Sequence, residues 1–480
     1  MIEVDTVIVG AGFAGLGMGM RLRRRGDESF VVLERADSVG GTWRDNVYPG
    51  VACDIPSHLY SFSFRPKHDW SRFFAPGAEI RDYLRDCATE IERHLRLGID
   101  VLDLRWSAGT ARWHVRTSGG DYVCRTVVMA AGRLSEARMP EIRGLASFPG
   151  EVVHSSRWDP QTDLRGKRVG VVGTGASAVQ LVPELAAVAG SVVVFQRTAP
   201  YVVPRPDFAY SADDIRAFAD DPAARSALRT DLYWRSETGF AERLGTPGFI
   251  DRLRDTALGH LAAQIDDDAL RERLTPRYEI GCKRVLLSDD FYPALARDTV
   301  TLEPSALVAV DGATATAANG AAAELDVLVF ATGFESTRPP FAQRVFGRDG
   351  RRLADEWDDG MVAFNSTTVH GFPNFYVIDG PNASLGHSSA IVMIEAQIAY
   401  ILGALDDPAE VLEVTAVSQA DYVAEIDAHA ASTVWLGGGC ASWYVDAGSG
   451  RLTLLWPDFA YAFRDRLAAF DRSAYLTTSR

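Results

Sequence analysis

The sequence predicts an α/β fold with two Rossmann-like three-layer domains, one inserted into the other, and a helical excursion. Three observations lead to this prediction. A glycine-rich turn follows a buried strand at Gly10, and a second such turn follows another strand at Gly173. The chain has 480 residues, too many for one ordinary domain. Each turn opens a strand-turn-helix-strand unit, so two nucleotide sites are expected.

The first unit begins with a strand over residues 4–9 and continues through Gly10-Ala11-Gly12-Phe13-Ala14-Gly15 into a helix that Gly26 stops. Glycines let the backbone approach a pyrophosphate, and the helix N-terminus faces its negative charge. Glu34 stands at the end of the next strand, where a carboxylate accepts hydrogen bonds from ribose hydroxyls. A carboxylate disfavours a 2′-phosphate, so this site suits FAD or NAD.

The second unit has its strand at 169–172 and its turn at Gly173-Thr174-Gly175-Ala176-Ser177-Ala178, followed by a helix through Leu185. Pro183 is expected to kink or shorten that helix. The next strand ends in Arg197 and Thr198, where a cation replaces the acid of the first unit. Arginine is the expected partner of the 2′-phosphate of NADPH, the alternative being a solvated surface side chain. We therefore expect FAD at the first turn and NADPH at the second.

The order of these units sets the predicted domains. A linker rich in Pro and Gly is expected over residues 132–150, and helical spacing predicts a helical insertion at about 207–275. The apolar run 325–333 is expected to be a buried strand that rejoins the first domain. The predicted FAD-binding domain is therefore discontinuous, with residues 1–140 and 325–480, and the NADPH-binding domain spans 150–324.

Composition excludes several classes of protein. The net charge of -15 argues against nucleic acid as a partner, and no apolar run reaches membrane-spanning length. The five cysteines are scattered and odd in number, so neither a disulfide framework nor a metal site is expected. With no signal-peptide pattern at the start, a cytoplasmic protein is expected. No two cysteines form the CxxC pair that a disulfide reductase needs near its flavin.

Two longer motifs indicate one kind of protein among those that bind two nucleotides. Residues 148–159 read FPGEVVHSSRWD and match FxGxxxHxxxW(P/D), and residues 40–54 fit (A/G)GxWxxxx(F/Y)P(G/M)xxxD. On these motifs the sequence resembles the flavin-dependent Baeyer-Villiger monooxygenases, which belong to the class B flavin monooxygenases. The similarity extends over nearly the whole chain through residues 57–64, 331–334, 380–387, 442–444 and 455–457. One departure is Ala131 before Gly132, where the family more often has Thr.

The resemblance implies a reaction and its residues. NADPH reduces FAD, O2 adds to give a flavin peroxide, and this attacks a ketone substrate to give an ester or lactone. Arg284 occupies the position of the family's catalytic arginine, with Asp54 as its carboxylate partner, and Lys283 is expected near the NADPH ribose or phosphate. Thr42, Trp43 and Tyr60 are expected to contact cofactor. A fixed guanidinium stabilises an anionic peroxide, which agrees with this role.

Other interpretations stay open at this stage. The alternative function is an N- or S-oxygenating flavin monooxygenase, and from another class a non-oxygenating FAD reductase or an inactive binding module. For Arg284 and Asp54, the alternative is that they form separate surface contacts. His154 is placed in the linker between the domains, where it and Trp158 are interpreted as fixing how the two domains meet. His387 either lies beside the flavin or is a simple loop residue. The aromatic residues near the C-terminus are expected in the core. The sequence identifies neither the ketone nor the oligomeric state.

Overall fold

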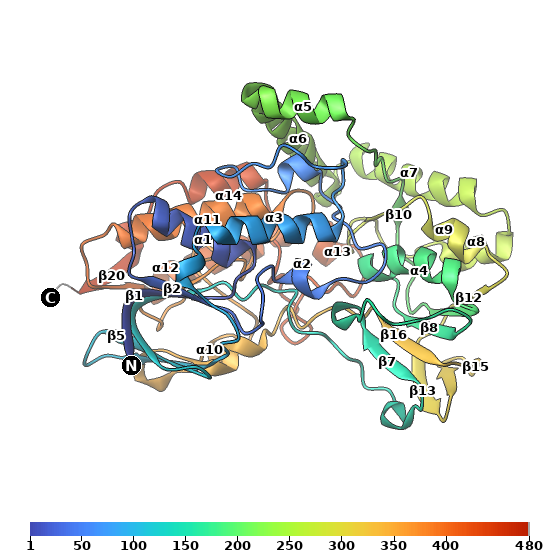
Figure 1. Cartoon of the computed structure of the whole chain (residues 1–480), viewed down its shortest axis with the longest axis horizontal. Coiled ribbons are helices and arrows are strands. Elements are labelled where there is room, and N and C mark those ends of the chain that lie inside the picture. The colour runs from blue at the N-terminus through green and yellow to red at the C-terminus, as the bar shows by residue number, and fades with distance from the viewer. Residues whose placement is uncertain (479–480) are drawn as a thin grey trace.

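The computed structural model describes residues 1–478, in which two sheets form the centres of two packed units (Figure 1). The first sheet has the order β17-β4-β5-β6-β1-β2-β3, and β18 also pairs with β6. Its strands are β1 (Ile2–Val9), β2 (Phe30–Leu33), β3 (Leu95–Arg96), β4 (Val101–Ser107), β5 (Arg112–Thr117), β6 (Tyr122–Met129), β17 (Val345–Phe346) and β18 (Phe375–Val377).

Strand β1 lies at the centre of this sheet, parallel to β2 on one side and to β6 on the other. Val7 and Ile8 are fully buried, as expected for a central strand covered on both faces. Ile8 packs under helices α1 (Phe13–Arg24), α3 (Gly77–Thr89) and α11 (Ala390–Leu405). Val7 faces the antiparallel strands β4 and β5 and the chain around α10 (Leu353–Glu356).

The second sheet is parallel throughout, with the order β12-β9-β8-β16-β7. Its strands are β7 (Glu151–His154), β8 (Arg168–Val172), β9 (Ser191–Phe195), β12 (Val300–Glu303) and β16 (Val327–Phe330). Helices α4 (Ala176–Val188) and α9 (Phe291–Leu295) cover one face. The antiparallel strands β13 (Leu307–Asp311), β14 (Thr314–Ala317) and β15 (Ala322–Glu324) cover the other and form the third layer.

Two sequence predictions about this sheet are wrong. Strand β16 was expected to rejoin the first domain at residue 325, but it pairs with β8 and β7 inside the second sheet. His154 was expected in an interdomain linker, but it is the last residue of the edge strand β7, opposite Phe330. Both errors have one physical cause: a short apolar strand shows its burial in its own sequence but not its partner. The chain returns to the first sheet only at β17, which pairs with β4.

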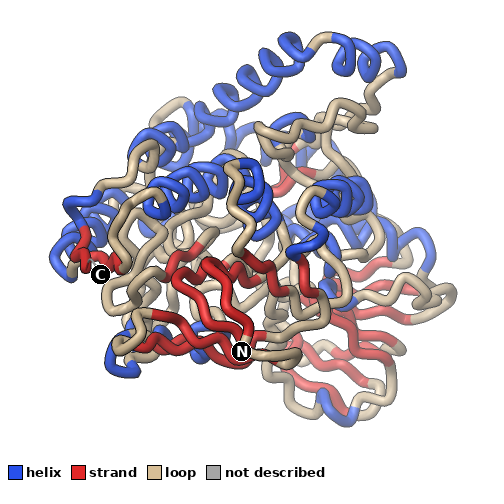
Figure 2. The backbone as a smooth tube through the Cα atoms, turned by 60° about the vertical axis from the view of Figure 1, so that its left-hand side comes forward, coloured by secondary structure: helices blue, strands red, loops and turns tan. Residues whose placement is uncertain are grey.

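The predicted helical excursion is confirmed. Figures 1 and 2 show helices α5 and α6 projecting from the body of the molecule. The excursion consists of α5 (Ala212–Asp220), α6 (Pro222–Arg243), α7 (Phe249–Gln264) and α8 (Asp268–Leu274). Helix α4 contains Pro183 but continues to Val188, so the proline does not shorten it. Its ring removes one donor and leaves the remaining turns intact.

The remaining elements are short or lie in the C-terminal part of the first unit. They are α2 (Thr42–Asp45), α12 (Ala416–Ala430), α13 (Val434–Gly437), α14 (Ala460–Arg466), β10 (Val202–Val203), β11 (Leu286–Leu287), β19 (Val411–Val414) and β20 (Tyr475–Thr478). Strand β10 pairs with β11, and β19 with β20. Within residues 1–478, every helix is too short or too polar to cross a lipid bilayer.

The cysteines were predicted to form no disulfide framework, and the structure contains one disulfide that the sequence did not predict. Cys282 and Cys440 are bonded, with their Cα atoms 6.2 Å apart, although they are far apart in the sequence. Cys53, Cys87 and Cys124 are free and buried. An odd number of scattered cysteines excludes a framework of several bridges but cannot exclude a single pair that folding brings together.

Candidate active site

The first glycine-rich turn is a tight cradle at the carboxyl end of β1. Gly10 has a φ of 105°, and a Cβ there would lie 2.4 Å from the carbonyl oxygen of Ala130. A Cβ on Gly15 would lie 1.8 Å from the carbonyl oxygen of Gly10. Only glycine fits either position, so the backbone is arranged for the close approach that a dinucleotide pyrophosphate requires.

Glu34 is held against this turn. Its Oε2 accepts from the backbone N–H of Ala11 at 2.9 Å, and its Oε1 accepts from Arg44 at 2.9 Å and from the N–H of Ala36 at 2.9 Å. The carboxylate is buried, as is much of Arg44. A buried carboxylate that accepts several charge-assisted bonds is fixed in place before a ribose arrives.

The predicted cofactor contacts Thr42, Trp43 and Tyr60 lie beside the same turn. Helix α2 begins at Thr42 after Gly41, and Gly41 lies in van der Waals reach of Gly12. The indole Nε1 of Trp43 donates to the hydroxyl of Tyr60 at 3.2 Å. The structure therefore brings these three residues together beside the first turn, although Tyr60 comes from a later segment than Thr42 and Trp43.

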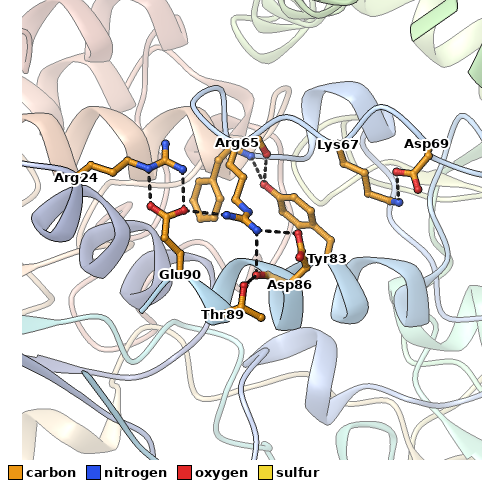
Figure 3. Close-up of polar contacts among 9 residues, drawn as sticks. Arg24, Arg65, Lys67, Asp69, Tyr83, Asp86, Thr89 and Glu90 are labelled. Atoms are coloured by element: carbon orange, nitrogen blue, oxygen red, sulfur yellow. Dashed lines mark hydrogen bonds and ion pairs between the residues drawn. The ribbon is translucent and has the colours of Figure 1, made fainter. Parts of the chain in front are cut away.

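A network of polar contacts fixes the segment that follows Tyr60 (Figure 3). The hydroxyl of Tyr83 donates to the carbonyl oxygen of Arg65 at 2.8 Å and accepts from the N–H of Phe62 at 2.9 Å. Arg24 and Arg65 both bind Glu90, at 2.6 Å and 2.8 Å, and the Arg24 guanidinium lowers the pKa of that carboxyl. This segment is thereby attached to α1 and α3.

The second turn is tight at its first glycine and open at its second. A Cβ on Gly173, which has a φ of 112°, would lie 2.6 Å from the carbonyl oxygen of Ala331, but a Cβ on Gly175 would meet no atom within 4 Å. The hydroxyl of Thr174 donates to the carbonyl oxygen of Thr198 at 2.9 Å, and Ser177 lies beside Tyr48. Arg197 is exposed at the end of β9.

Lys283 stands close to Arg197 and completes a cationic edge. Burial lowers the pKa of Lys283, and the nearby charge of Arg197 lowers it further. The ammonium lies 5.1 Å from the centre of the Tyr278 ring. Two cations that repel each other at a nucleotide turn are arranged to receive an anion, because a phosphate would neutralise both.

Asp54 and Arg284 form an ion pair across the two units. The Nε and an Nη of Arg284 both approach Oδ2 of Asp54 at 2.6 Å. The charge of Asp54 raises the pKa of Arg284 further above its usual value, against the opposing effect of burial. The guanidinium is thus permanently charged, and 27% of its side chain is exposed, which leaves it available to a further group.

Contacts with the second unit place the loop that carries Asp54. The side chain amide of Gln180, in α4, donates to the carbonyl oxygen of Ala52 at 2.9 Å, and Arg205 donates to that of Cys53 at 3.2 Å. The hydroxyl of Tyr48 donates to Gln180 at 3.0 Å. The position of Asp54 therefore depends on how the second unit docks, which sequence alone does not reveal.

Sequence reasoning missed two members of this site. Arg133 is buried, forms an ion pair with Asp379, and lies near Tyr60, Tyr444 and Arg284; burial lowers its pKa to about 10. Its Nε has no hydrogen-bond partner within residues 1–478. Tyr444 was expected in the core, and it is buried. Burial raises the pKa of its hydroxyl, and the charges of Arg284 and Arg243 oppose that rise. The place of Arg133, just beyond a strand whose carboxyl end meets the first turn, was an available signal.

His154 and His387 are both buried against other parts of the protein and contact polar groups there. His154 contacts the carbonyl oxygen of Gly333 at 3.0 Å and the hydroxyl of Ser156 at 2.8 Å, and burial lowers its pKa. Trp158 is buried in the core of the second unit. The side chain of His387 is fully buried 3.3 Å from Glu237 of α6, so it is not an open loop residue.

Comparisons with known proteins cover almost the whole chain. A family model for pyridine nucleotide-disulphide oxidoreductases matches residues 7–215. A Streptomyces coelicolor protein named Baeyer-Villiger monooxygenase is 44% identical over 98% of this chain and 92% of its own length. The structure of an oxidized steroid monooxygenase bound to NADP is 30% identical, with a TM-score of 0.86 and complete coverage of both chains. An OTEMO complex with FAD and NADP is 26% identical, with a TM-score of 0.85 and 97% coverage of each chain.

Proposed function

We infer the function of this chain from the family to which it belongs, the Baeyer-Villiger monooxygenases. It is an FAD-dependent oxidoreductase that uses NADPH and O2 and inserts one oxygen atom next to a ketone carbonyl, giving an ester or lactone. Reduced FAD supplies the electrons that activate O2. We also propose which residues of this chain hold the two cofactors and which act on the reacting atoms.

We assign FAD to the first turn and NADPH to the second. In support, the cradle of Gly10 and Gly15 excludes any side chain, and the buried carboxylate of Glu34 suits a ribose that carries no 2′-phosphate. The cationic edge of Arg197 and Lys283 suits the 2′-phosphate of NADPH. The orphaned Nε of buried Arg133 offers one more donor to the FAD side. The FAD-binding domain then consists of the two outer segments of the chain and the NADPH-binding domain of the middle segment.

The ion pair between Asp54 and Arg284 carries the proposal for catalysis. Oxygen insertion next to a carbonyl needs a nucleophilic, anionic oxygen, and a fixed cation lowers the free energy of that charge. Arg284 supplies a guanidinium whose charge is not titrated, and Asp54 orients it through two contacts at 2.6 Å. The ketone would lie beside this guanidinium. An electrophilic oxygen donor, as used in S- or N-oxygenation, does not need such a cation.

The test compares the holoenzyme with Arg284→Ala and Arg284→Lys on a ketone and on a sulfide. We expect Arg284→Ala to lower kcat for ester formation by ~10²–10³, the usual cost of losing one electrostatic stabiliser. NADPH should still reduce the bound FAD, because Arg284 is assigned to oxygen insertion, which comes later. The loss of flavin absorbance measures this reduction. Product mass with labelled O2 identifies the oxygen inserted.

Arg284→Lys is the matched variant, since it keeps a charge but loses the fork that faces Asp54. We expect it to retain an intermediate rate of ester formation. Full ester formation by Arg284→Ala would contradict the assignment, and a sulfoxide as the sole product of the unmodified enzyme would contradict the function.

A further inference from the structure

The disulfide between Cys282 and Cys440 joins two segments that meet at the candidate active site. Cys282 directly precedes Lys283 and Arg284, in the chain that returns from the helical excursion. Cys440 follows α13 in the C-terminal part of the first unit. The bond therefore ties the segment that carries the catalytic arginine to a segment of the other unit.

The C-terminal segment, residues 433–446, lies directly against Arg284. Tyr444 is buried, and burial raises the pKa of its hydroxyl, while the nearby charge of Arg284 opposes that rise. Trp435 and Tyr444 pack in one cluster with Ile280. Movement of this segment would therefore uncover the side of the site where Arg284 stands.

Local geometry brings the two cysteines together independently of their sulfur bond. The N–H of Glu279 donates to the carbonyl oxygen of Gly438 at 2.9 Å. A Cβ on Gly438 would lie 2.7 Å from Cβ and 3.0 Å from Sγ of Cys282, so only glycine permits this approach. Glycine at this position allows the backbone of the C-terminal segment to lie on Cys282.

The two bonded cysteines differ in exposure, so a reductant is expected to reach Cys440 first. Cys282 is fully buried, whereas Cys440 is partly exposed. The other three cysteines are buried, and burial raises the pKa of Cys87 to about 11 and that of Cys124 to about 12. A thiol with so high a pKa is a poor nucleophile at neutral pH, so redox chemistry concentrates at this one pair.

We propose that Cys282 and Cys440 form a reversible redox site that controls the access of bulky ketones to Arg284. In the disulfide form, residues 433–446 are held against the site. In the dithiol form they separate from it more easily. This proposal rests on the function proposed above, because it concerns access to the same guanidinium.

The chemistry of the switch balances with ordinary redox partners. Oxidation takes two thiols and one hydrogen peroxide to one disulfide and two waters, so each sulfur loses one electron and the peroxide O–O bond is broken. Reduction uses an external dithiol: its thiolate attacks Sγ of the exposed Cys440, the Sγ–Sγ bond breaks, and Cys282 leaves as the thiolate. The second thiol of the reductant then closes its own disulfide and frees Cys440.

The experiment uses the purified FAD-loaded enzyme, divided into a peroxide-treated and a dithiothreitol-treated sample. Iodoacetamide labelling of denatured aliquots before and after reduction, read by peptide mass spectrometry, reports the state of each cysteine, including the buried ones. We expect Cys282 and Cys440 to be labelled only after reduction. The value of kcat/KM for a bulky cyclic ketone, divided by that for a small one, should rise about fivefold or more in the reduced sample, which is the lower end of typical coupling between sites.

Three variants separate the possible outcomes. Cys440→Ser should give the high ratio in both samples, and Gly438→Ala should weaken disulfide formation because its methyl meets Cys282. Cys124→Ala, which removes a thiol remote from the pair, should keep the response. Labelling of Cys282 and Cys440 in the peroxide-treated sample would overturn the redox site, and an unchanged ratio in Cys440→Ser would overturn control of access. Neither result would affect ester formation itself, so failure of the proposed function would be seen separately.

Discussion

The two glycine-rich turns have the same plan but differ in how tightly the protein surrounds them. Gly15 in the first turn corresponds to Ala178 in the second, so the second turn holds a Cβ at a position where the first has no room for one. The acid of the first unit, Glu34, is buried and accepts three hydrogen bonds. The corresponding cation of the second, Arg197, is exposed.

This difference teaches how one fold serves two kinds of cofactor. A prearranged, enclosed site retains its ligand, because few side chains must be ordered when the ligand binds and slow opening limits its release. A more open site with an exposed cation recognises charge but releases its ligand readily. The first turn is therefore suited to a cofactor that stays through many reactions, and the second to one that exchanges in each reaction.

Gly15→Ala should break the enclosed site and have the largest effect. Its methyl would lie 1.8 Å from the carbonyl oxygen of Gly10, so α1 must move away from the turn. We expect a loss of about 3 kcal/mol in the free energy of unfolding, as for severe overpacking, together with loss of bound FAD. Urea unfolding and the flavin absorbance of the purified protein measure both.

A control for the added methyl group is Gly175→Ala in the second turn, where a Cβ meets no atom within 4 Å. The free energy of unfolding of this variant should stay within about 0.5 kcal/mol of the parent. Equal destabilisation by the two substitutions would show that overlap with the carbonyl oxygen of Gly10 is not the cause of the loss in Gly15→Ala.

Glu34→Gln tests the prearranged carboxylate with little change of shape. The neutral amide loses the ion pair with Arg44, and its NH2 group replaces one of the two oxygens that accept hydrogen bonds, so the contact with the ribose is weakened. We expect FAD affinity to fall by about 1.5–3 kcal/mol, the usual range for a bond to a charged group. Titration of apoenzyme with FAD measures this change, and an unaltered dissociation constant would remove Glu34 from the site.

Arg197→Ala tests the open site and should have a smaller effect, because the side chain is exposed. The KM for NADPH should rise ~10-fold, corresponding to ~1.5 kcal/mol, whereas that for NADH should stay nearly constant. Arg165→Ala is a suitable control, since this exposed arginine precedes the amino end of β8 and pairs with Asp163. A parallel rise for both nucleotides would contradict recognition of the 2′-phosphate.

The contrast between the turns was largely predictable from sequence, because each turn is local. Residues that lie within one strand-turn-helix unit must meet, so the amino-acid sequence alone predicts that Gly10, Gly15 and Glu34 lie together. Arg284 and Asp54 are far apart in sequence. Only the resemblance to a family joined them, and in the folded chain they lie 2.6 Å apart.

What could not be predicted depends on long-range pairing. The apolar run of β16 is compatible with either sheet, and nothing in its sequence selects β8 as its neighbour. The ion pair of Arg133 with Asp379 and the bond of Cys282 to Cys440 each join loops from distant segments. Such contacts follow from docking of whole units, and the residues concerned carry no local periodicity that would reveal them.

The pH dependence of NADPH binding also distinguishes the two turns, and it is the smallest of the expected effects. Burial lowers the pKa of Lys283, and the charge of Arg197 lowers it more, so Lys283 loses its proton at a lower pH than an ordinary lysine. The KM for NADPH should therefore rise on the alkaline side as this cation is neutralised.

Removal of Arg197 removes one cause of the lowered pKa of Lys283, so in Arg197→Ala the rise in KM should shift to higher pH. In Lys283→Arg the charge persists, and the rise should flatten, whereas FAD binding at the first turn should show no such dependence. If the alkaline rise in KM were the same in Lys283→Arg as in the parent, another group would be titrating and the cationic edge would consist of Arg197 alone.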